Sequence, residues 1–533
     1  MVWVSAGSAL HVLRVRHPFR AAIGAAVLVG AIGSCVTNVR YESVPLAGPR
    51  VVRSPVKAHL VDGSTIVFSD GITIDNSLVT GDGARYDIRL NPVGAVPGVA
   101  LDSVLAMESF RTETDVIRSI SSVYLHTAAG ALLAAAIFGS CPTVYSDGTG
   151  VELLEAEAFS YSIAPLFESR DVDRLAVGVD DQGEVRLEVR NEALETHYIN
   201  HFELIEVGHA SHEQVVPDPE GRPVRLGSPL ALQHAADRDG RDVTELLSRP
   251  DGILYTSSVS RIENAIASVP GEVEDHIELD LTVPLGTGQI GLHLRLRNSL
   301  LATVLFYDMM LGDRGARALD WLGQDLGEIG PAVELGQWAA DNLGMRISVL
   351  ESGTWREVAR IPDKGPLAWD DVAVVVPVSP DRTEASVRIR LAFPADHWRI
   401  DHVTPFETAR YAEGRVVPLS MIQALDGSDQ TDMLANLASA DDSYLVTSPG
   451  HAFEVVFRPG VDARQDGRNR SRTFFLASQG YYIEWVRQSW LAAGRETEPF
   501  RPGPETLVEA LRRWHAARDT MEEQFYATRI PVR

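Results

Sequence analysis

Apolar and polar residues alternate along several stretches of the second half of the chain, namely 184–191, 276–283, 291–297 and 385–391. Successive side chains of a β-strand point to opposite faces, so this alternation predicts strands with one buried and one wet face. The run 371–377 is largely apolar, which is typical of a central sandwich strand. The pattern therefore predicts β-sandwich domains over most of the chain.

A different pattern precedes these strands. Between residues 56 and 112, short apolar runs alternate with turn residues such as Asp62-Gly63 and Asp70-Gly71. The runs are 58–61, 65–68, 78–81, 85–88 and 104–107. Several strands in so short a segment predict a small barrel of SH3 or Lsm type.

Helical spacing of apolar residues marks two further segments. One is an insertion at 315–342, and the other is a C-terminal helix near 505–525. The expected fold class is mainly β: a small SH3/Lsm-like barrel, an apolar helix, then jelly-roll-like β-sandwich domains with a helical insertion and a C-terminal helix. The apolar positions are Leu319, Leu322, Leu326 and Trp338 in the insertion, and Leu507, Leu511, Trp514 and Met521 in the last helix.

These patterns divide the chain into eight expected parts. They are a signal peptide (1–34), a linker (35–55), the barrel (56–112), an apolar helix (113–141), a β-rich domain (142–270), a β-sandwich with a helical insertion (271–411, insertion 315–342), a β-rich segment (412–500) and the C-terminal helix (501–533).

The N-terminus has the order of an export signal. Arg14, Arg16 and Arg20 precede the uncharged stretch 21–34, and Ile32-Gly33-Ser34-Cys35 follows the pattern of a bacterial lipobox. This resemblance implies cleavage before Cys35 and lipidation of its thiol. An uncleaved anchor and a buried helix are the alternatives, but the stretch is shorter than the roughly 20 residues of a membrane span.

The segment 113–141 is the second apolar stretch, and it contains no charged residue between Arg118 and Asp147. It is long enough to cross a bilayer, yet its following flank is acidic, whereas a cytoplasmic flank is usually basic. We favour a buried or membrane-surface helix, with a membrane span as the alternative.

Composition excludes some partners. The 533 residues carry 48 Lys and Arg against 73 Asp and Glu, a formal net charge of −25, which argues against nucleic-acid binding. The two cysteines are Cys35 and Cys141, so lipidation of Cys35 would leave no disulfide partner. Cys141 follows an apolar run, which indicates a small buried residue rather than a nucleophile.

Several short motifs between Cys141 and about Trp490 follow one another in a particular order. The motifs are Cys141–Gly148, Val189–Tyr198, Gly240–Val243, Asp396–Asp401, Asp442–Ala452 and Arg472–Tyr481. In this order the region resembles the C-terminal part of secreted bacterial proteins that carry TPR or FG-GAP (VCBS-type) repeats. The resemblance implies β-sandwich domains on an exported protein, without an assigned catalytic role.

Two motifs suggest cofactors at first sight. The sequence 286–291 spells GxGxxG, but a strand pattern follows it where a dinucleotide site needs a helix, so we predict a hairpin turn. His197, His201, His209 and His212 lie near Glu195 and Glu203. Four residues along a strand span about 13 Å, too far for His197 and His201 to share a zinc ion, so we expect solvent-facing histidines.

No cofactor and no metal are therefore expected. A cluster of three aspartates in a polar loop leaves a calcium site as an open alternative to a solvated turn. Aromatic side chains are the remaining candidates for ligand contact, although core packing is their commoner role. The aspartates are Asp426, Asp429 and Asp432, and the aromatic candidates are Trp398, Tyr481, Tyr482 and Trp485.

The sequence lacks GxSxG, HExxH and P-loop motifs. We expect a non-catalytic lipoprotein of the cell envelope, periplasmic or outer-membrane-associated, held to the membrane by its N-terminal lipid. Its expected role is to bind or scaffold an envelope protein or glycan. A carbohydrate-binding accessory protein is the first alternative, and an unrecognised hydrolase is the second.

Overall fold

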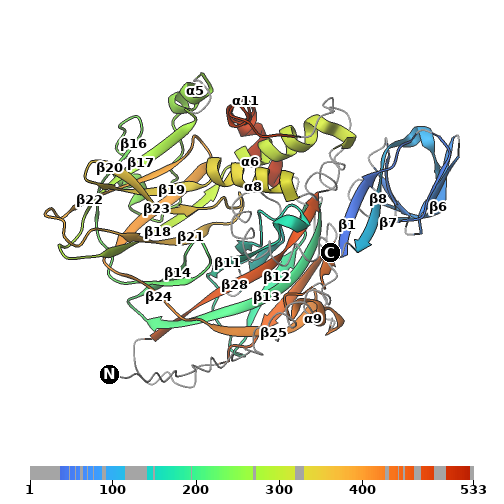
Figure 1. The fold of residues 1–533 in the computed structure, drawn as a ribbon. Coiled ribbons are helices and arrows are strands. Elements are labelled where there is room, and N and C mark those ends of the chain that lie inside the picture. Colours follow the sequence, from blue (N-terminus) through green and yellow to red (C-terminus); the bar gives the residue numbers. More distant parts are fainter. Residues whose placement is uncertain are drawn as a thin grey trace, which may run out of the picture.

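The computed structural model describes residues 37–114 and 141–527, with gaps at 47, 55, 61–63, 69, 76, 87–91, 148–150, 194, 268–271, 318–328, 426–430, 442, 448–450, 461–469 and 485–499. The described chain is mainly β, as predicted. Three large hydrophobic cores organise it: one in the N-terminal sheet, one in a β-sandwich and one between a long sheet and several helices (Figure 1).

The N-terminal part is a curved, barrel-like sheet of eight strands in the order β1-β8-β3-β4-β6-β5-β2, with β7 paired to β6. Gly71 has φ +87°, and a Cβ there would overlap the backbone of β2, so a larger residue does not fit. The strands are β1 (Thr37–Ser43), β2 (Arg50–Val52), β3 (Val56–Leu60), β4 (Thr65–Phe68), β5 (Ile72–Asp75), β6 (Leu78–Tyr86), β7 (Pro92–Ala100) and β8 (Val104–Thr114); the short helix η1 (Leu101–Ser103) precedes β8.

This sheet corrects the expected linker. Residues 37–43 pair with β8 and residues 50–52 pair with β5, so most of the range 35–55 forms the edges of the barrel-like sheet. Pro45, Gly48 and Pro49 lie in the turn between β1 and β2 rather than in a spacer, and Pro55 lies outside the described residues. The predicted strand 78–81 and the first two residues of the predicted strand 85–88 belong to the single strand β6, and residues 87 and 88 lie outside the described residues.

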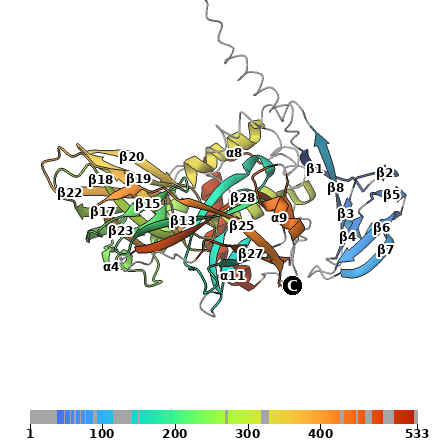
Figure 2. The same ribbon diagram turned by 90° about the horizontal axis from the view of Figure 1, so that it is seen from below.

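A nine-stranded sheet forms the centre of the molecule, in the order β10-β9-β12-β27-β25-β13-β28-β11, with β26 paired to β13. Its two longest strands, β13 and β28, run antiparallel side by side from Glu195↔Glu484 to Ala210↔Arg470 (Figure 2). The strands are β9 (Thr143–Ser146), β10 (Leu153–Glu157), β11 (Ser169–Leu175), β12 (Val185–Arg190), β13 (Glu195–Ala210), β25 (Arg415–Ala424), β26 (Leu445–Thr447), β27 (Ala452–Phe457) and β28 (Arg470–Glu484). The expected parts 142–270 and 412–500 thus contribute to one sheet.

A β-sandwich is inserted in the chain between β13 and β25. A five-stranded sheet, β16-β17-β22-β19-β20, faces a three-stranded sheet, β21-β18-β23, across one apolar core. The strands are β16 (Leu232–Asp237), β17 (Glu274–Thr282), β18 (Gln289–Asn298), β19 (Met345–Glu351), β20 (Thr354–Ile361), β21 (Asp370–Pro377), β22 (Ser386–Pro394) and β23 (Trp398–Phe406). A third small sheet consists of β14 (Gln214–Pro217), β15 (Pro223–Leu226) and β24 (Ala409–Tyr411).

The glycine-rich motif 286–291 begins in the turn after β17 and continues into the first three residues of β18. A strand follows it, as predicted, but the two strands belong to different sheets. The turn is therefore a crossing from one face of the sandwich to the other, not a hairpin.

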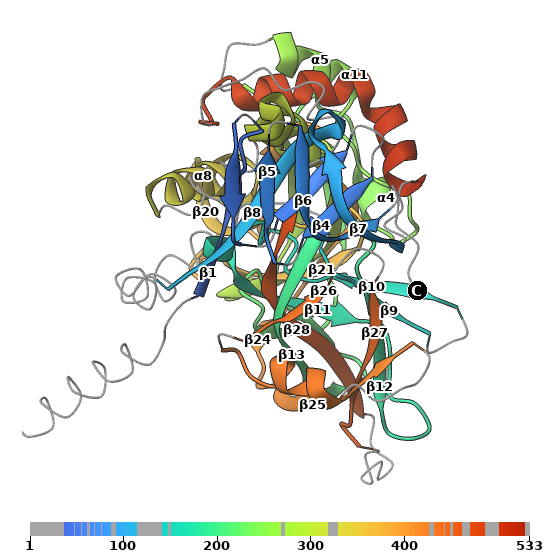
Figure 3. The same ribbon diagram turned by 90° about the vertical axis from the view of Figure 1, so that its right-hand side faces the viewer.

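Helices cover one face of the nine-stranded sheet and share its core. The C-terminal helix α11 (Thr506–Ala527) confirms the helical prediction, with Leu507, Leu511 and Trp514 buried, and it packs beside α5 (Figure 3). The predicted insertion begins earlier than residue 315, directly after β18. The other helices are η2 (Pro165–Phe167), α4 (Thr244–Leu247), α5 (Val259–Ala267), α6 (Leu301–Thr303), the π-helix η3 (Val304–Leu311), η4 (Gly312–Arg317), α8 (Ile329–Asn342) and α9 (Thr431–Leu437). Of these, α4 packs on β16 and β23 and belongs to the core of the sandwich instead.

Several predictions lie outside the described residues, among them the signal peptide, the lipid-modified Cys35, and Leu319, Leu322 and Leu326 of the helical insertion. The expected apolar helix 113–141 also lies outside them over residues 115–140, and its first two residues belong to β8. Among the helices that the structure describes, none is both long and apolar enough to cross a bilayer.

Candidate functional site

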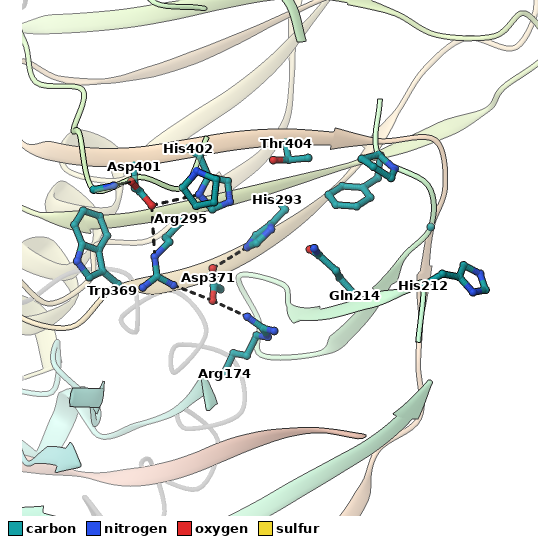
Figure 4. Close-up of a pocket in the computed structure, with 15 residues that line it drawn as sticks. Arg174, His212, Gln214, His293, Arg295, Trp369, Asp371, Asp401, His402 and Thr404 are labelled. Atoms are coloured by element: carbon teal, nitrogen blue, oxygen red, sulfur yellow. Dashed lines mark hydrogen bonds and ion pairs between the residues drawn. The ribbon is translucent and has the colours of Figure 1, made fainter. Parts of the chain in front are cut away.

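An open cleft of about 780 Å³ lies on the outer face of the three-stranded sheet β21-β18-β23 (Figure 4). The opposite face of this sheet packs in the sandwich core. Arg174 from β11 and Gln214 from β14 line the cleft as well, so it lies where the inserted sandwich meets the rest of the chain.

Strand alternation explains why polar side chains gather here. On β18, Leu292, Leu294 and Leu296 belong to the sandwich core, so His293 and Arg295 between them point to the cleft. These outward positions are part of the alternating pattern 291–297 seen in the sequence.

A β-bulge adds a second pair of polar side chains. On β23 the pairing with β18 shifts between Leu296↔Ile400 and Arg295↔His402. In a regular strand, two residues that are neighbours in sequence point to opposite faces. The extra residue in β23 breaks this alternation, so Asp401 and His402 both line the cleft.

Asp371, the second residue of β21, is the centre of the polar network. Its Oδ1 accepts a hydrogen bond from His293 Nε2 at 2.8 Å, and its Oδ2 lies 3.0 Å from Arg174 Nη1 and 3.4 Å from Arg295 Nη1. Burial opposes ionisation of this carboxyl, but the hydrogen bond from His293 and the charges around it outweigh burial and lower its pKa. Asp371 is therefore a carboxylate at neutral pH.

Asp401 is the second carboxylate of the network and contacts Arg295 and His402. Its Oδ2 lies 3.6 Å from Arg295 Nε and 3.4 Å from His402 Nδ1, and its Oδ1 accepts the backbone N–H of Gly252 at 2.9 Å. The rings of His293 and His402 meet edge to face, with centroids 5.1 Å apart. Burial lowers the pKa of His402, and the charge of His293 lowers it further.

Trp369 supplies a half-buried aromatic wall at the start of β21. The guanidinium carbons of Arg295 and Arg297 lie 5.8 Å and 5.2 Å from its ring centroid, within the range of cation–π contacts. The cleft thus combines one indole with hydrogen-bond donors and acceptors, among which the two arginines, Arg174 and Arg295, are matched in number by two aspartates.

The aromatic residues proposed from sequence lie elsewhere. Trp398 and Tyr482 are 0% exposed and Tyr481 is 5% exposed, so their rings pack inside the protein and do not line a ligand surface. Trp398 donates its Nε1–H to the Leu343 carbonyl at 3.2 Å. Trp485 lies outside the described residues.

Sequence reasoning missed the cleft. The outward positions of β18 carried a signal, since a histidine and an arginine alternate with leucines. No local signal marks Arg174 or Trp369, because only the tertiary fold brings β11 and the start of β21 to the same place.

The histidines of β13 differ from one another. His197 is fully buried, in contrast to the expected solvent-facing position, and burial lowers its pKa to about 3. His201 Nδ1 contacts the Leu437 carbonyl at 2.9 Å. Within the described part of the chain, no group of three or more His, Cys, Asp or Glu side chains has the geometry of a metal site.

Two further candidates can be located. Cys141 is buried and free, its Sγ lies 3.7 Å from Glu157 Oε1, and burial raises its pKa well above the usual value, which fits the predicted small buried residue. Asp432 lies in α9, whereas Asp426 and Asp429 are outside the described residues.

Comparisons with known proteins give no family. No family model matches the chain, and no curated protein matches it. Among solved structures, the chain is similar to TmCBM61, whose structure was solved in complex with β-1,4-galactotriose. The identity is 13% and the TM-score is 0.14, and the match covers 25% of this chain and 65% of TmCBM61. The chain thus spans slightly less than two thirds of that module.

It is also similar to the C-terminal CBM6 of LamC, a marine laminarinase from Zobellia galactanivorans, with 10% identity and a TM-score of 0.14. This match covers 38% of this chain and 98% of the other. Both TM-scores are too low for either likeness to assign a function.

Proposed function

We propose that this protein is a non-catalytic glycan-binding protein of the cell envelope and that the cleft on β21-β18-β23 is its binding site. One observation carries the proposal. The indole of Trp369 lies in the same open cleft as several planar polar side chains, in which two arginines are matched by two aspartates. Ligand sites commonly combine an aromatic wall with a few convergent polar groups.

The chemistry of the cleft favours a neutral polyhydroxylated ligand. Sugar hydroxyls both donate and accept hydrogen bonds, and Arg174, Arg295, Asp371, Asp401 and Gln214 offer both functions. A phosphate or carboxylate ligand would instead need guanidinium groups without carboxylate partners. Here Arg174 and Arg295 are already within 3.0 Å and 3.4 Å of Asp371.

The state of Asp371 supports binding rather than hydrolysis. Glycoside hydrolysis requires a general acid whose pKa is raised so that it carries a proton at working pH. The ion pairs of Asp371 act in the opposite direction and lower its pKa. We infer that this carboxylate orients the ligand and its own cationic neighbours.

Titration calorimetry with a panel of neutral and uronic-acid-containing oligosaccharides tests the proposal. Trp369→Ala should lower the affinity for a neutral oligosaccharide at least about tenfold, a loss of about 1.4 kcal/mol. Trp355→Ala is the matched control, since Trp355 is also half-buried under an arginine, with Arg390 4.1 Å from its ring centroid, but lies outside the cleft. Equal losses in both variants, binding confined to acidic sugars, or sugar cleavage would contradict the proposal.

The location at the envelope is a separate part of the proposal. Its support is the basic, apolar and lipobox-like sequence that ends in Cys35. Wild type and Cys35→Ala, expressed in a bacterial host, should differ in palmitate labelling, with the label absent from the variant. Unlabelled wild type, with its body protected from protease in spheroplasts, would refute this location.

A further inference from the structure

We propose that Glu157 is a positioning residue for the cleft: from β10 of the nine-stranded sheet, its carboxylate fixes the segment 365–368 and thereby the place of Trp369. The part that concerns ligand affinity rests on the proposed function of the cleft. The part that concerns the position of the segment stands on contacts alone.

The carboxyl group of Glu157 binds the backbone of the segment that leads to Trp369. Its Oε2 accepts the backbone N–H groups of Leu367 at 2.7 Å and Ala368 at 2.8 Å, the two residues before Trp369. A Cβ at Gly365 would overlap the carboxylate, so glycine lets the segment approach it closely. One side chain from a distant strand therefore holds two of the four residues that lead to the indole and lies close against a third, Gly365.

The same segment is held from its other side by β18. Arg297 Nη1 donates a hydrogen bond to the Pro366 carbonyl, and the Asn298 N–H donates to the Gly365 carbonyl at 3.1 Å. The Arg297 guanidinium also lies over the Trp369 ring. The segment is thus clamped between β10 of the long sheet and β18 of the sandwich.

A buried lysine secures the start of this segment. Lys364 Nζ lies 3.6 Å from Asp171 Oδ1 on β11 and 3.5 Å from Asp370 Oδ1 at the start of β21. The indole therefore has a fixed place before a ligand arrives, which reduces the ordering that binding would require. Glu157 is the anchor that holds Leu367 and Ala368, the two residues directly before Trp369.

The test compares Glu157→Leu, which removes the acceptors, with Glu157→Gln, which keeps one acceptor oxygen. Gly365→Ala attacks the same contact from the loop side and guards against a failure of Glu157→Leu to fold. Glu155→Gln is the matched control, because Glu155 is a buried carboxylate on the same strand that accepts the Ala176 N–H at 2.6 Å and makes no contact with this segment. Hydrogen exchange of peptides covering 364–369 is measured first.

Exchange in this segment should become at least about tenfold faster in Glu157→Leu and Gly365→Ala, and change little in Glu157→Gln and Glu155→Gln. Unchanged exchange in both Glu157→Leu and Gly365→Ala would overturn the proposal, whatever the ligand. Accelerated exchange supports the anchor even if wild type binds no glycan, in which case only the proposed function fails.

Affinity then tests whether Glu157 acts through Trp369. Glu157→Leu should weaken oligosaccharide binding about tenfold in the wild type but less than about twofold in a Trp369→Ala background, because the two losses share one cause. Rescue by Glu157→Gln is also expected. Full additivity of the two losses would overturn the positioning role while leaving glycan binding in the cleft intact.

Discussion

Replacing Glu157 with glutamine is expected to change how the stability of the protein depends on pH. Burial, partly offset by the two backbone N–H groups, raises the pKa of Glu157 from 4.5 to about 7. The titratable groups that face it are Cys141, Asp370 and Arg297. At about 1.4 kcal/mol for each pH unit, this rise corresponds to about 3 kcal/mol of unfolding free energy.

The sign follows from the direction of the pKa shift. Below pH 4.5, Glu157 is protonated in both states, and its contribution to stability is fully present. As the pH rises to about 7, the unfolded chain releases the proton first, so the contribution is lost. Glutamine does not titrate, and the stability of wild type relative to Glu157→Gln should therefore fall by about 3 kcal/mol between pH 4.5 and 7.5.

Urea unfolding of both proteins at closely spaced pH values, followed by circular dichroism, measures this difference. The comparison must be with the variant, because other buried groups titrate in the same range. A difference that stays constant within about 0.5 kcal/mol, or that grows with pH, would refute the assignment of a buried carboxyl with a raised pKa.

Three further predictions concern the cores. Trp398→Phe should lower the free energy of unfolding in urea by about 2–4 kcal/mol, because it leaves a small void and removes the hydrogen-bond donor of the Leu343 carbonyl. Calorimetry of the same variant should show unchanged oligosaccharide affinity. Leu511→Ala should cost about 2–5 kcal/mol in urea unfolding, since this side chain is 0% exposed where α11 joins the long sheet's core. Burial lowers the pKa of His197 from 6.5 to about 3, so its contribution to stability is present above pH 6.5 and is lost as the pH falls. The stability of wild type relative to His197→Gln should therefore fall by about 2 kcal/mol from pH 6.5 to 4.5, opposite in direction to the effect of Glu157.

Local patterns in the sequence predicted individual elements well. The alternating stretches 184–191, 276–283, 291–297 and 385–391 coincide with β12, β17, β18 and β22, and the C-terminal helix lies where its apolar spacing placed it. In both cases the side-chain direction repeats at a fixed interval along one element, so residues only a few positions apart reveal which of them share a face.

The same patterns misplaced residues whose surroundings come from distant parts of the chain. Trp398 and Tyr482 carry no local mark that distinguishes a core ring from a ligand platform, and the structure buries both. Residues 37–43 lacked a recognisable period, yet they form a strand because β8 offers a free edge to pair with. The expected linker 35–55 is wrong for a related reason, because Pro45, Gly48 and Pro49 occupy the turn between β1 and β2.

By itself, the sequence determined the mainly β class, the positions of most strands and the C-terminal helix, because alternation and helical spacing are set by local burial. The tertiary structure alone decided that β13 pairs with β28, although the two strands lie far apart in the sequence. It also decided that the sandwich is inserted between β13 and β25 and that Glu157 contacts the segment before Trp369. Strand partners and buried polar contacts depend on which distant surfaces meet, and the pattern of one strand does not specify its partner.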